Sequence, residues 1–279
     1  IRLSLVGSEM CIRDRRNPYR EIFRAPGSAG FCFAAFIARM PISMLSLGLV
    51  TLFAALHYSY STSTSVVAVY VLMGALMGPQ LSRLADRYGQ QRIVLFCSPI
   101  AISSLLCLLY AIVHRAPVWL LLFLSAGIGF LPNFGTLVRV RWTKIYSGSP
   151  KLRTAFAFES IADELIFIIG PILAIFLSTN IAPILGTLAA AGFLAVGSIL
   201  FLLQKKTAPK PFPHTKGSKN LLLAFPFVFF FTVNFLAIGS VYTSAEIATL
   251  AFCRSIHMQT YASIPVSYTH LRAHETKAN

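Results

Sequence analysis

Several ionisable side chains lie within long apolar stretches of the chain, where a charge is costly. Four of them are the main candidates for a functional site. They are Arg39, Asp163, Glu164 and Glu246. A charge inside a bilayer costs several kcal/mol, so it faces water, an opposite charge or a ligand. Such residues could anchor a solute or carry a coupling ion, such as a proton. Two alternatives stay open: Arg39 could form a structural pair with an acid of residues 156–177, and Glu246 could lie at the outer membrane interface.

Three carboxylates stand close together in the run FESIADELIF, at the start of residues 156–177. Glu159 and Asp163 are four residues apart, so a helix places them on one face, with Glu164 about 100° away. Desolvated carboxyl groups among like charges can bind protons near neutral pH, which would suit a proton relay. The acids could equally pair with arginines near the amino end of this helix. Asp163 and Glu164 lie deeper and are the better coupling candidates.

The composition is typical of a membrane protein. Hydrophobic residues make up 56% of the 279 residues and charged residues only 12%. Seven apolar stretches have about the length of a membrane-spanning helix. They cover approximately residues 30–56, 66–81, 93–113, 118–138, 156–177, 181–203 and 221–252. The predicted fold class is therefore all-α and transmembrane.

Other functional classes find little support in the sequence. The net charge of +15 does not indicate nucleic-acid binding, because the basic residues are spread between apolar stretches and do not cluster on one face. The five cysteines show no paired spacing, which predicts neither a metal site nor a disulfide framework. No HExxH motif, paired metal ligands or catalytic dyad is evident, so we expect neither an enzyme nor a cofactor. The expected partners are the lipid bilayer and a small solute.

The distribution of Lys and Arg predicts the orientation. Within residues 16–220, sixteen of them lie before the first stretch and after the second, fourth and sixth stretches, whereas Arg115 is the one in a loop on the opposite side. By the positive-inside rule, the amino terminus and residues 204–220 are cytoplasmic. We therefore expect a multi-pass protein of the cell membrane.

A charged run, GPQLSRLADRYGQQR over residues 78–92, separates the second and third stretches. Just before and within it, Gly74, Gly78 and Ser82 recur every four residues and would form a small-residue stripe on a helix. Such a stripe allows another helix to approach closely. Three arginines surround a single carboxylate, which predicts a short loop at the membrane surface.

The segment RLADRYGQQR resembles the loop between the second and third helices of major facilitator superfamily transporters. Asp86, Arg87, Gly89 and Arg92 match that pattern, whereas Ser82 stands where glycine is usual. The two glutamines that follow Gly89 also depart from the usual basic residues. The resemblance implies that this loop controls the conformational cycle. Its residues of interest are Gly78, Ser82, Arg83, Asp86, Arg87, Gly89 and Arg92.

The resemblance also implies an architecture and a function. A six-helix half-bundle would occupy residues 16–203, a cytoplasmic linker residues 204–220, and the first helix of a second, incomplete domain residues 221–263. The expected function is secondary active transport of a small solute by alternating access, with protons as a candidate coupling ion. The alternative is a non-transporting membrane scaffold or receptor, although such a protein has no reason to keep a charge at Arg39.

The two ends of the chain differ from the rest. Residues 1–15 and 264–279 resemble translated sequencing-adaptor read-through, with SLVGSEMCIRDR near the start and PVSYTHLRAHETKAN at the end. Neither segment has helical periodicity. We therefore expect both to lie outside the native fold.

Overall fold

The computed structural model describes residues 18–209 and 211, together with residues 230, 233, 234, 236–241, 244 and 248. Its helices, in chain order, are α1 (Pro18–Ile22), α2 (Ser28–Ala55), α3 (Tyr60–Tyr88), α4 (Gln90–Val113), α5 (Val118–Ile128), α6 (Phe134–Tyr146), α7 (Lys151–Asn180), α8 (Leu185–Leu203) and the 3-10 turn η1 (Lys205–Thr207). Five of them, α2, α3, α4, α7 and α8, are long and apolar enough to cross a membrane. The predicted all-α transmembrane fold class is confirmed.

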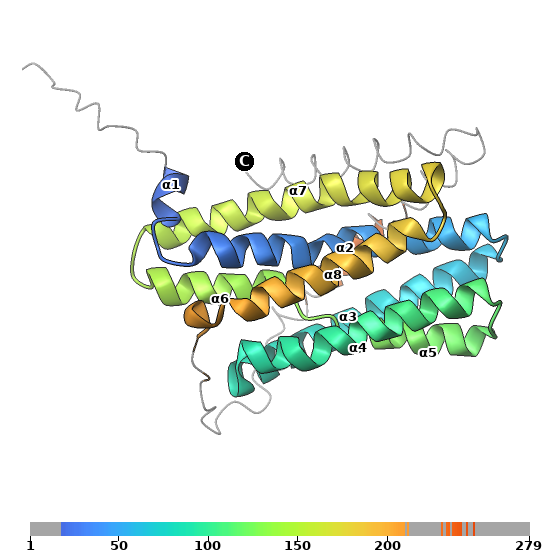
Figure 1. Cartoon of the computed structure of the whole chain (residues 1–279), viewed down its shortest axis with the longest axis horizontal. Coiled ribbons are helices and arrows are strands. Elements are labelled where there is room, and N and C mark those ends of the chain that lie inside the picture. The colour runs from blue at the N-terminus through green and yellow to red at the C-terminus, as the bar shows by residue number, and fades with distance from the viewer. Residues whose placement is uncertain are drawn as a thin grey trace, which may run out of the picture.

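Helix α2 occupies the centre of the bundle. It packs against α3, α6, α7 and α8, and 72% of its most apolar window is buried, compared with 22% for α3. Figure 1 shows the long helices running side by side along the long axis of the molecule, with α2 between α7 and the α3–α5 group. A residue on α2 is therefore placed to contact several other helices.

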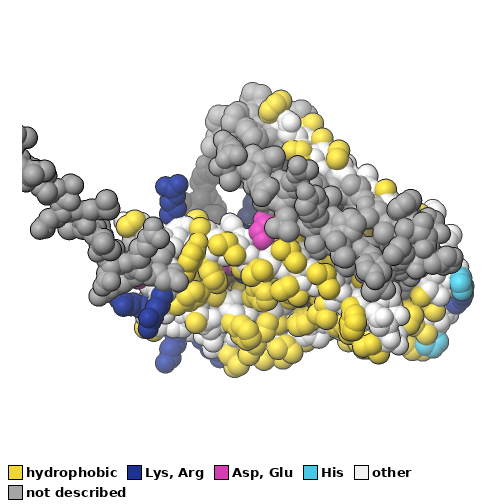
Figure 2. Space-filling model, turned by 90° about the horizontal axis from the view of Figure 1, so that it is seen from above, with side chains coloured by type: hydrophobic (Ala, Val, Ile, Leu, Met, Phe, Trp, Pro, Cys, Tyr) yellow, Lys and Arg dark blue, Asp and Glu magenta, His cyan; other side chains and the backbone are white. Residues whose placement is uncertain are grey.

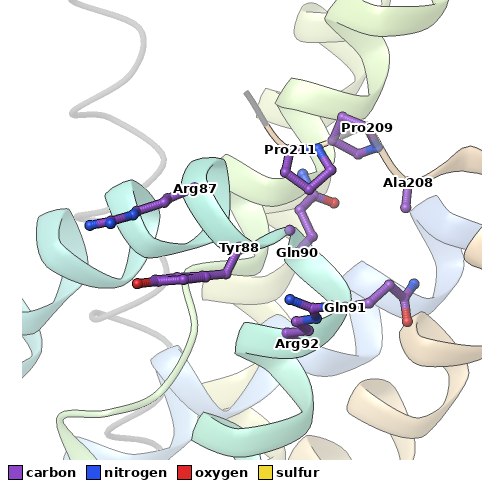
Figure 3. Close-up of a pocket in the computed structure, with 9 residues that line it drawn as sticks. Arg87, Tyr88, Gln90, Gln91, Arg92, Ala208, Pro209 and Pro211 are labelled. Carbon is purple, nitrogen blue, oxygen red and sulfur yellow. The ribbon is translucent and has the colours of Figure 1, made fainter. Parts of the chain in front are cut away.

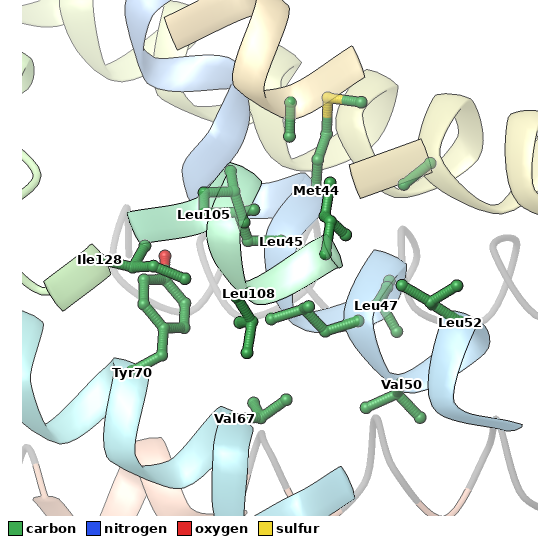
Figure 4. Packing of buried hydrophobic residues seen from close by; sticks show 14 of the residues in the cluster. Met44, Leu45, Leu47, Val50, Leu52, Val67, Tyr70, Leu105, Leu108 and Ile128 are labelled. Atoms are coloured by element: carbon green, nitrogen blue, oxygen red, sulfur yellow. The ribbon is translucent and has the colours of Figure 1, made fainter. Parts of the chain in front are cut away.

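In the described part of the chain, buried apolar side chains form two clusters. One surrounds the carboxyl-terminal half of α2, where Met44, Leu45 and Leu105 pack together (Figure 4). The other surrounds the amino-terminal half of α2 and includes Phe31 and Trp142. Many large apolar side chains outside these clusters are exposed, and Figure 2 shows them spread over the visible surface. A lipid-facing surface accounts for such exposure, which would be a liability in water.

Side-chain hydrogen bonds connect neighbouring helices at several positions along the bundle. The Ser43 hydroxyl of α2 donates to the carbonyl of Ile166 in α7 at 2.9 Å, and the Ser198 hydroxyl of α8 donates to that of Ser98 in α4 at 3.0 Å. Hydrogen bonds of this kind stabilise helix packing in lipid, where burial of apolar surface gives no driving force.

The fourth apolar stretch is divided, which corrects the prediction of one continuous span over residues 118–138. Helix α5 ends at Ile128, and α6 begins at Phe134. Pro132 lacks a backbone N–H and disfavours helical geometry at the residue before it. The Asn133 side chain then accepts the Thr136 N–H at 3.1 Å and caps the new helix. Glycine and proline in this stretch break the helix although its hydropathy is continuous.

The charged run of residues 78–92 is helical over most of its length, which corrects the prediction of a short loop. Helix α3 extends to Tyr88, and α4 begins at Gln90, so the junction is Gly89 alone. Gly89 has φ 92°, a backbone conformation that glycine adopts without a steric penalty. Polar side chains continue these helices beyond the apolar stretches, into the region where water can solvate them.

The basic residues lie mainly toward one end of the bundle. The α3–α4 and α6–α7 junctions and η1 lie at the same end as α1, whereas the α2–α3, α4–α5 and α7–α8 junctions lie at the other (Figure 1). In Figure 2 the visible Lys and Arg side chains gather mostly toward the α1 end and the histidines toward the opposite end. The loops that are rich in Lys and Arg in the sequence thus lie together at one end of the folded bundle.

Candidate functional site

Arg39 lies inside the bundle and contacts two carboxylates of α7. Its Nη2 atom is 2.6 Å from Glu159 Oε2, and its Nη1 atom is 2.7 Å from Asp163 Oδ1. Its Nε atom donates to the carbonyl of Ala35 at 3.1 Å, which holds the guanidinium plane against α2. Because Glu159 and Asp163 are one helical turn apart, the planar fork of arginine can reach both.

Glu159 is the most enclosed member of this group. Besides Arg39, it accepts hydrogen bonds from the Trp142 indole N–H at 2.9 Å and from the Cys32 thiol at 3.2 Å. Its side chain has no exposed surface. A buried carboxylate is tolerated when an opposite charge and further donors satisfy its oxygens, and here three side chains from α2 and α6 do so.

The group extends toward solvent through Asp163. The second oxygen of Asp163 lies 2.7 Å from Arg139 Nη2, so this carboxylate bridges two arginines. Exposure of the side chains rises from 3% at Arg39 to 30% at Asp163 and 37% at Arg139. We refer to Arg39, Arg139, Glu159 and Asp163 as the charge network. It balances two cations against two anions and has one buried end and one accessible end.

A cavity of about 270 Å³ lies next to the charge network. Its lining residues are Ile42, Ser46, Tyr70, Val71, Gly74, Gly78, Ile128, Leu131 and Asn133. Ile42 and Ser46 lie three and seven residues after Arg39, which places all three on one face of α2. The cavity is therefore one to two helical turns from the network. We call it the central cavity.

The interruption between α5 and α6 forms one wall of the central cavity. A Cβ atom on Gly129 would lie 2.5 Å from the Cβ of Met73 and 2.9 Å from the backbone nitrogen of Gly74, so this turn packs directly against α3. Irregular backbone at membrane depth is tolerated where it is buried in protein or lines a cavity. In the break, Gly129 and Pro132 are buried, and Leu131 and Asn133 line the cavity.

The structure brings only some of the predicted site residues together. Arg39 and Asp163 are in direct contact, whereas half-buried Glu164 lies on a neighbouring face of α7. Glu246 lies outside the described residues. Glu159, which the sequence ranked below its two neighbours, makes the most enclosed contact with Arg39. The spacing of Glu159 and Asp163 by four residues was the signal that could have ranked it higher.

The structure places the motif residues at the α1 end of the bundle. Asp86 is exposed and makes no hydrogen bond or ion pair with any described residue. Added Cβ atoms on Gly74 and Gly78 would meet nothing within 4 Å among the described residues. The small-residue stripe therefore has no helix packed against it in this part of the chain. Whether Asp86 contacts a helix of a second domain stays a prediction.

The chain after η1 packs against this motif. Ala208, Pro209 and Pro211 close one side of a pocket of about 270 Å³ whose other side is formed by residues 87–92 (Figure 3). Lys144 Nζ donates to the carbonyl of Ala208 at 2.7 Å and ties the same segment to α6. The start of the predicted linker is thus attached to the helices that carry the motif.

Arg141 is a buried residue of this region that sequence reasoning did not single out as a site. Its guanidinium lies 3.8 Å from the ring centroid of Phe201 and donates to Gln90 Oε1 at 3.0 Å and to Thr207 Oγ1 at 2.9 Å. Burial lowers the pKa of Arg141 to about 10, so it remains a cation at neutral pH. Arg141 thereby joins α4, α6, α8 and η1 at the cytoplasmic side predicted from the charges.

The comparisons agree with the resemblance seen in the sequence. The family model of the Major Facilitator Superfamily matches residues 31–271, which is most of the chain. No curated protein matches the chain. Among the described residues, His, Cys, Asp and Glu side chains form no group of three that could hold a metal ion. From its family match and its membrane-spanning helices, this chain belongs to the Major Facilitator Superfamily, a family of multi-pass membrane transporters.

Proposed function

We propose that this protein moves a small solute across the cell membrane by alternating access, with the charge network at the centre of the mechanism. The observation that carries the proposal is the contact of Arg39 with both Glu159 and Asp163, beside a cavity formed by three different segments. A structural ion pair would need only one carboxylate. An arginine that bridges two carboxylates, one of them shared with a second arginine, offers a set of contacts that can be exchanged.

Asp163 is the group we expect to change partners. It is accessible to water, and it contacts Arg39 and Arg139 at the same distance of 2.7 Å. A proton, a solute group or a cation that neutralises or attracts this carboxylate would weaken both contacts together. Glu159, with no exposed surface, would keep Arg39 in place meanwhile. Protons remain our candidate coupling ion for this reason, and Glu164 and Glu246 are further candidates from the sequence.

The asymmetry of Lys and Arg supports the proposal that the amino terminus lies in the cytoplasm. We expect single cysteines at Ser61 and Asn180, in a cysteine-free background, to react with a membrane-impermeant thiol reagent added outside intact cells. Cysteines at Ser147 and Lys205 should react only after the cells are permeabilised. All four positions are exposed, so access to the side chain does not limit the reaction. The reverse labelling pattern would contradict a cytoplasmic amino terminus.

Substitution of Asp86 tests whether the motif controls the conformational cycle. In the intact transporter, we expect Asp86→Ala to lower the rate of solute exchange at least tenfold while solute affinity changes less than threefold. The reason is its position: Asp86 is exposed at the α1 end and lies away from the residues that line the central cavity. Exchange in proteoliposomes and equilibrium binding in detergent would measure the two quantities.

Gln80→Ala is the matched control, because Gln80 is another exposed polar residue of α3. It should leave both quantities near their wild-type values. If Asp86→Ala weakened solute binding as much as it slowed exchange, Asp86 would be a ligand-binding residue and its role in the conformational cycle would be rejected.

A further inference from the structure

The first residues after α8 pack closely against the start of α2. A Cβ atom on Gly27 would lie 2.9 Å from the methyl carbon of Thr207, and one on Gly30 would lie 2.8 Å from the side-chain nitrogen of Gln204. Thr207 is only 9% exposed, and its hydroxyl donates to the carbonyl of Gln204 at 3.1 Å. The start of the predicted linker is therefore fitted into the bundle and held by specific contacts.

Arg141 joins this turn to the motif of residues 78–92 through one rigid group. Its Nη1 atom donates to the carbonyl of Gln204 at 3.2 Å and to Thr207 Oγ1 at 2.9 Å. Its Nε atom donates to Gln90 Oε1 at 3.0 Å. Because the guanidinium group is planar, these nitrogen atoms cannot move independently. A displacement of Thr207 therefore changes the contact with Gln90, and a displacement of Gln90 changes the contact with Thr207.

Gln90 connects Arg141 to the first turn of α4. Its side chain is 3% exposed, and its amide nitrogen donates to the carbonyl of Leu137 at 3.0 Å. Leu137 and Arg141 are four residues apart on α6, so one face of that helix holds both ends of the Gln90 amide. A lysine or arginine at position 90 would have no acceptor for Arg141. This contact accounts for the glutamine that follows Gly89, where a basic residue is usual.

The charge of Arg141 is held by neutral groups. Arg141 is fully buried, yet no carboxylate of the described residues forms an ion pair with it, and its Nη2 atom has no hydrogen-bond partner among them. The face of the Phe201 ring, 3.8 Å from the guanidinium carbon, provides part of the compensation. A buried cation without an opposite charge keeps part of the cost of leaving water. Access of water on opening would lower this cost, so the contact can open more easily than a buried ion pair.

We infer that Arg141 is a positioning residue that couples the start of the linker to the conformational motif. It holds η1 against α2 and, through Gln90, fixes the first turn of α4 directly after Gly89. Such coupling is reciprocal, so loosening either segment should loosen the other. This role lies outside the charge network and the central cavity and goes beyond the proposed function.

Hydrogen–deuterium exchange with mass spectrometry tests the coupling, because it measures how often backbone amides open. The purified full chain in detergent is compared with single variants. Thr207→Val removes the hydroxyl that Arg141 contacts. We expect it to accelerate exchange two- to tenfold in peptides covering residues 90–96, the range expected for the loss of one hydrogen bond. Thr207→Ser keeps the hydroxyl and should exchange like wild type in these peptides.

The reciprocal experiment starts from the motif. Gln90→Ala should accelerate exchange in peptides covering residues 201–207 by a similar factor, although Gln90 forms no hydrogen bond with these residues. Gln80→Ala is the matched control, since it removes the same amide from an exposed position of α3. It should leave exchange in both sets of peptides unchanged.

Three outcomes would overturn the inference. Faster exchange confined to the substituted segment in both Thr207→Val and Gln90→Ala would show that Arg141 packs against both segments without coupling them. Equal effects of Thr207→Ser and Thr207→Val would exclude the hydroxyl contact as the cause. Faster exchange throughout the bundle would indicate a general loss of stability, which requires no coupling. The experiment involves no solute, so its failure would leave the proposed transport function standing, and a loss of transport function would leave the coupling standing.

Discussion

Arg39→Met should abolish solute transport in the intact transporter and lower its stability by about 3 to 5 kcal/mol, the usual effect of removing one partner from a buried ion pair. The loss in stability has a specific origin. Glu159 has no exposed surface and, among the described residues, would keep only the Trp142 indole and the Cys32 thiol as partners for its negative charge. Arg39→Lys should recover part of the stability but little transport, because an ammonium group cannot reproduce the planar contact with two carboxylates.

A double substitution distinguishes the contribution of Arg39 to stability from its contribution to transport. Arg39→Met combined with Glu159→Gln removes both buried charges, and the amide oxygen of the introduced glutamine can still accept the Trp142 N–H. Asp163 would keep Arg139 as a partner. We expect thermal unfolding of this variant close to wild type, within about 1 to 2 kcal/mol, because no buried charge is left unpaired. Transport should remain lost, since Asp163 no longer has two arginines between which to exchange.

The double variant also provides the outcome that would contradict the proposal. If it recovered both stability and transport, Arg39 and Glu159 would be a structural pair and nothing more. The sequence left that alternative open. Unfolding and transport should be measured on the same preparations of the single and double variants. Unfolding gives the coupling energy between Arg39 and Glu159, and transport shows whether the pair has a role in the mechanism.

Gly197→Ala should be strongly destabilising although it adds a single methyl group. Gly197 lies on α8 against α2, and a Cβ atom there would overlap the backbone nitrogen and Cα of Ala38. Backbone atoms in two packed helices cannot move aside as a side chain can, so the helices must separate. Overpacking of this kind costs about 1 to 3 kcal/mol or more. Because Ala38 precedes Arg39, we expect transport to fall as well.

Gly192 provides a control on the same helix. It is exposed, and an added Cβ would meet nothing within 4 Å among the described residues. Gly192→Ala should therefore leave the unfolding temperature unchanged or raise it slightly, because alanine has the higher helix propensity. Thermal unfolding in detergent compares the two variants directly. Similar unfolding temperatures for Gly197→Ala and Gly192→Ala would show that α8 does not pack on α2 as described.

The gross fold could be predicted because hydropathy is a local property. Long, mainly apolar stretches must form helices in a bilayer, since no other single-segment structure satisfies their backbone groups. The predicted stretches over residues 30–56 and 93–113 agree with α2 and α4 to within three residues at each end. Hydropathy could not show the break before Phe134, because the apolar character continues across it. Only local geometry at Pro132 and Asn133 ends one helix and starts the next.

The sequence by itself determined that Arg39 needed a partner, because a charge in an apolar stretch must be satisfied wherever that stretch packs. It also determined that Glu159 and Asp163 share a face, since their spacing is close to one helical turn. Which acid reaches Arg39, and that Trp142 and Cys32 complete the shell of Glu159, depended on how α2, α6 and α7 rotate and slide against one another. Only the tertiary structure decided this. The rotation and register of the helices follow from contacts between them, such as Gly197 of α8 against Ala38 of α2. No short segment of sequence contains both sides of such a contact.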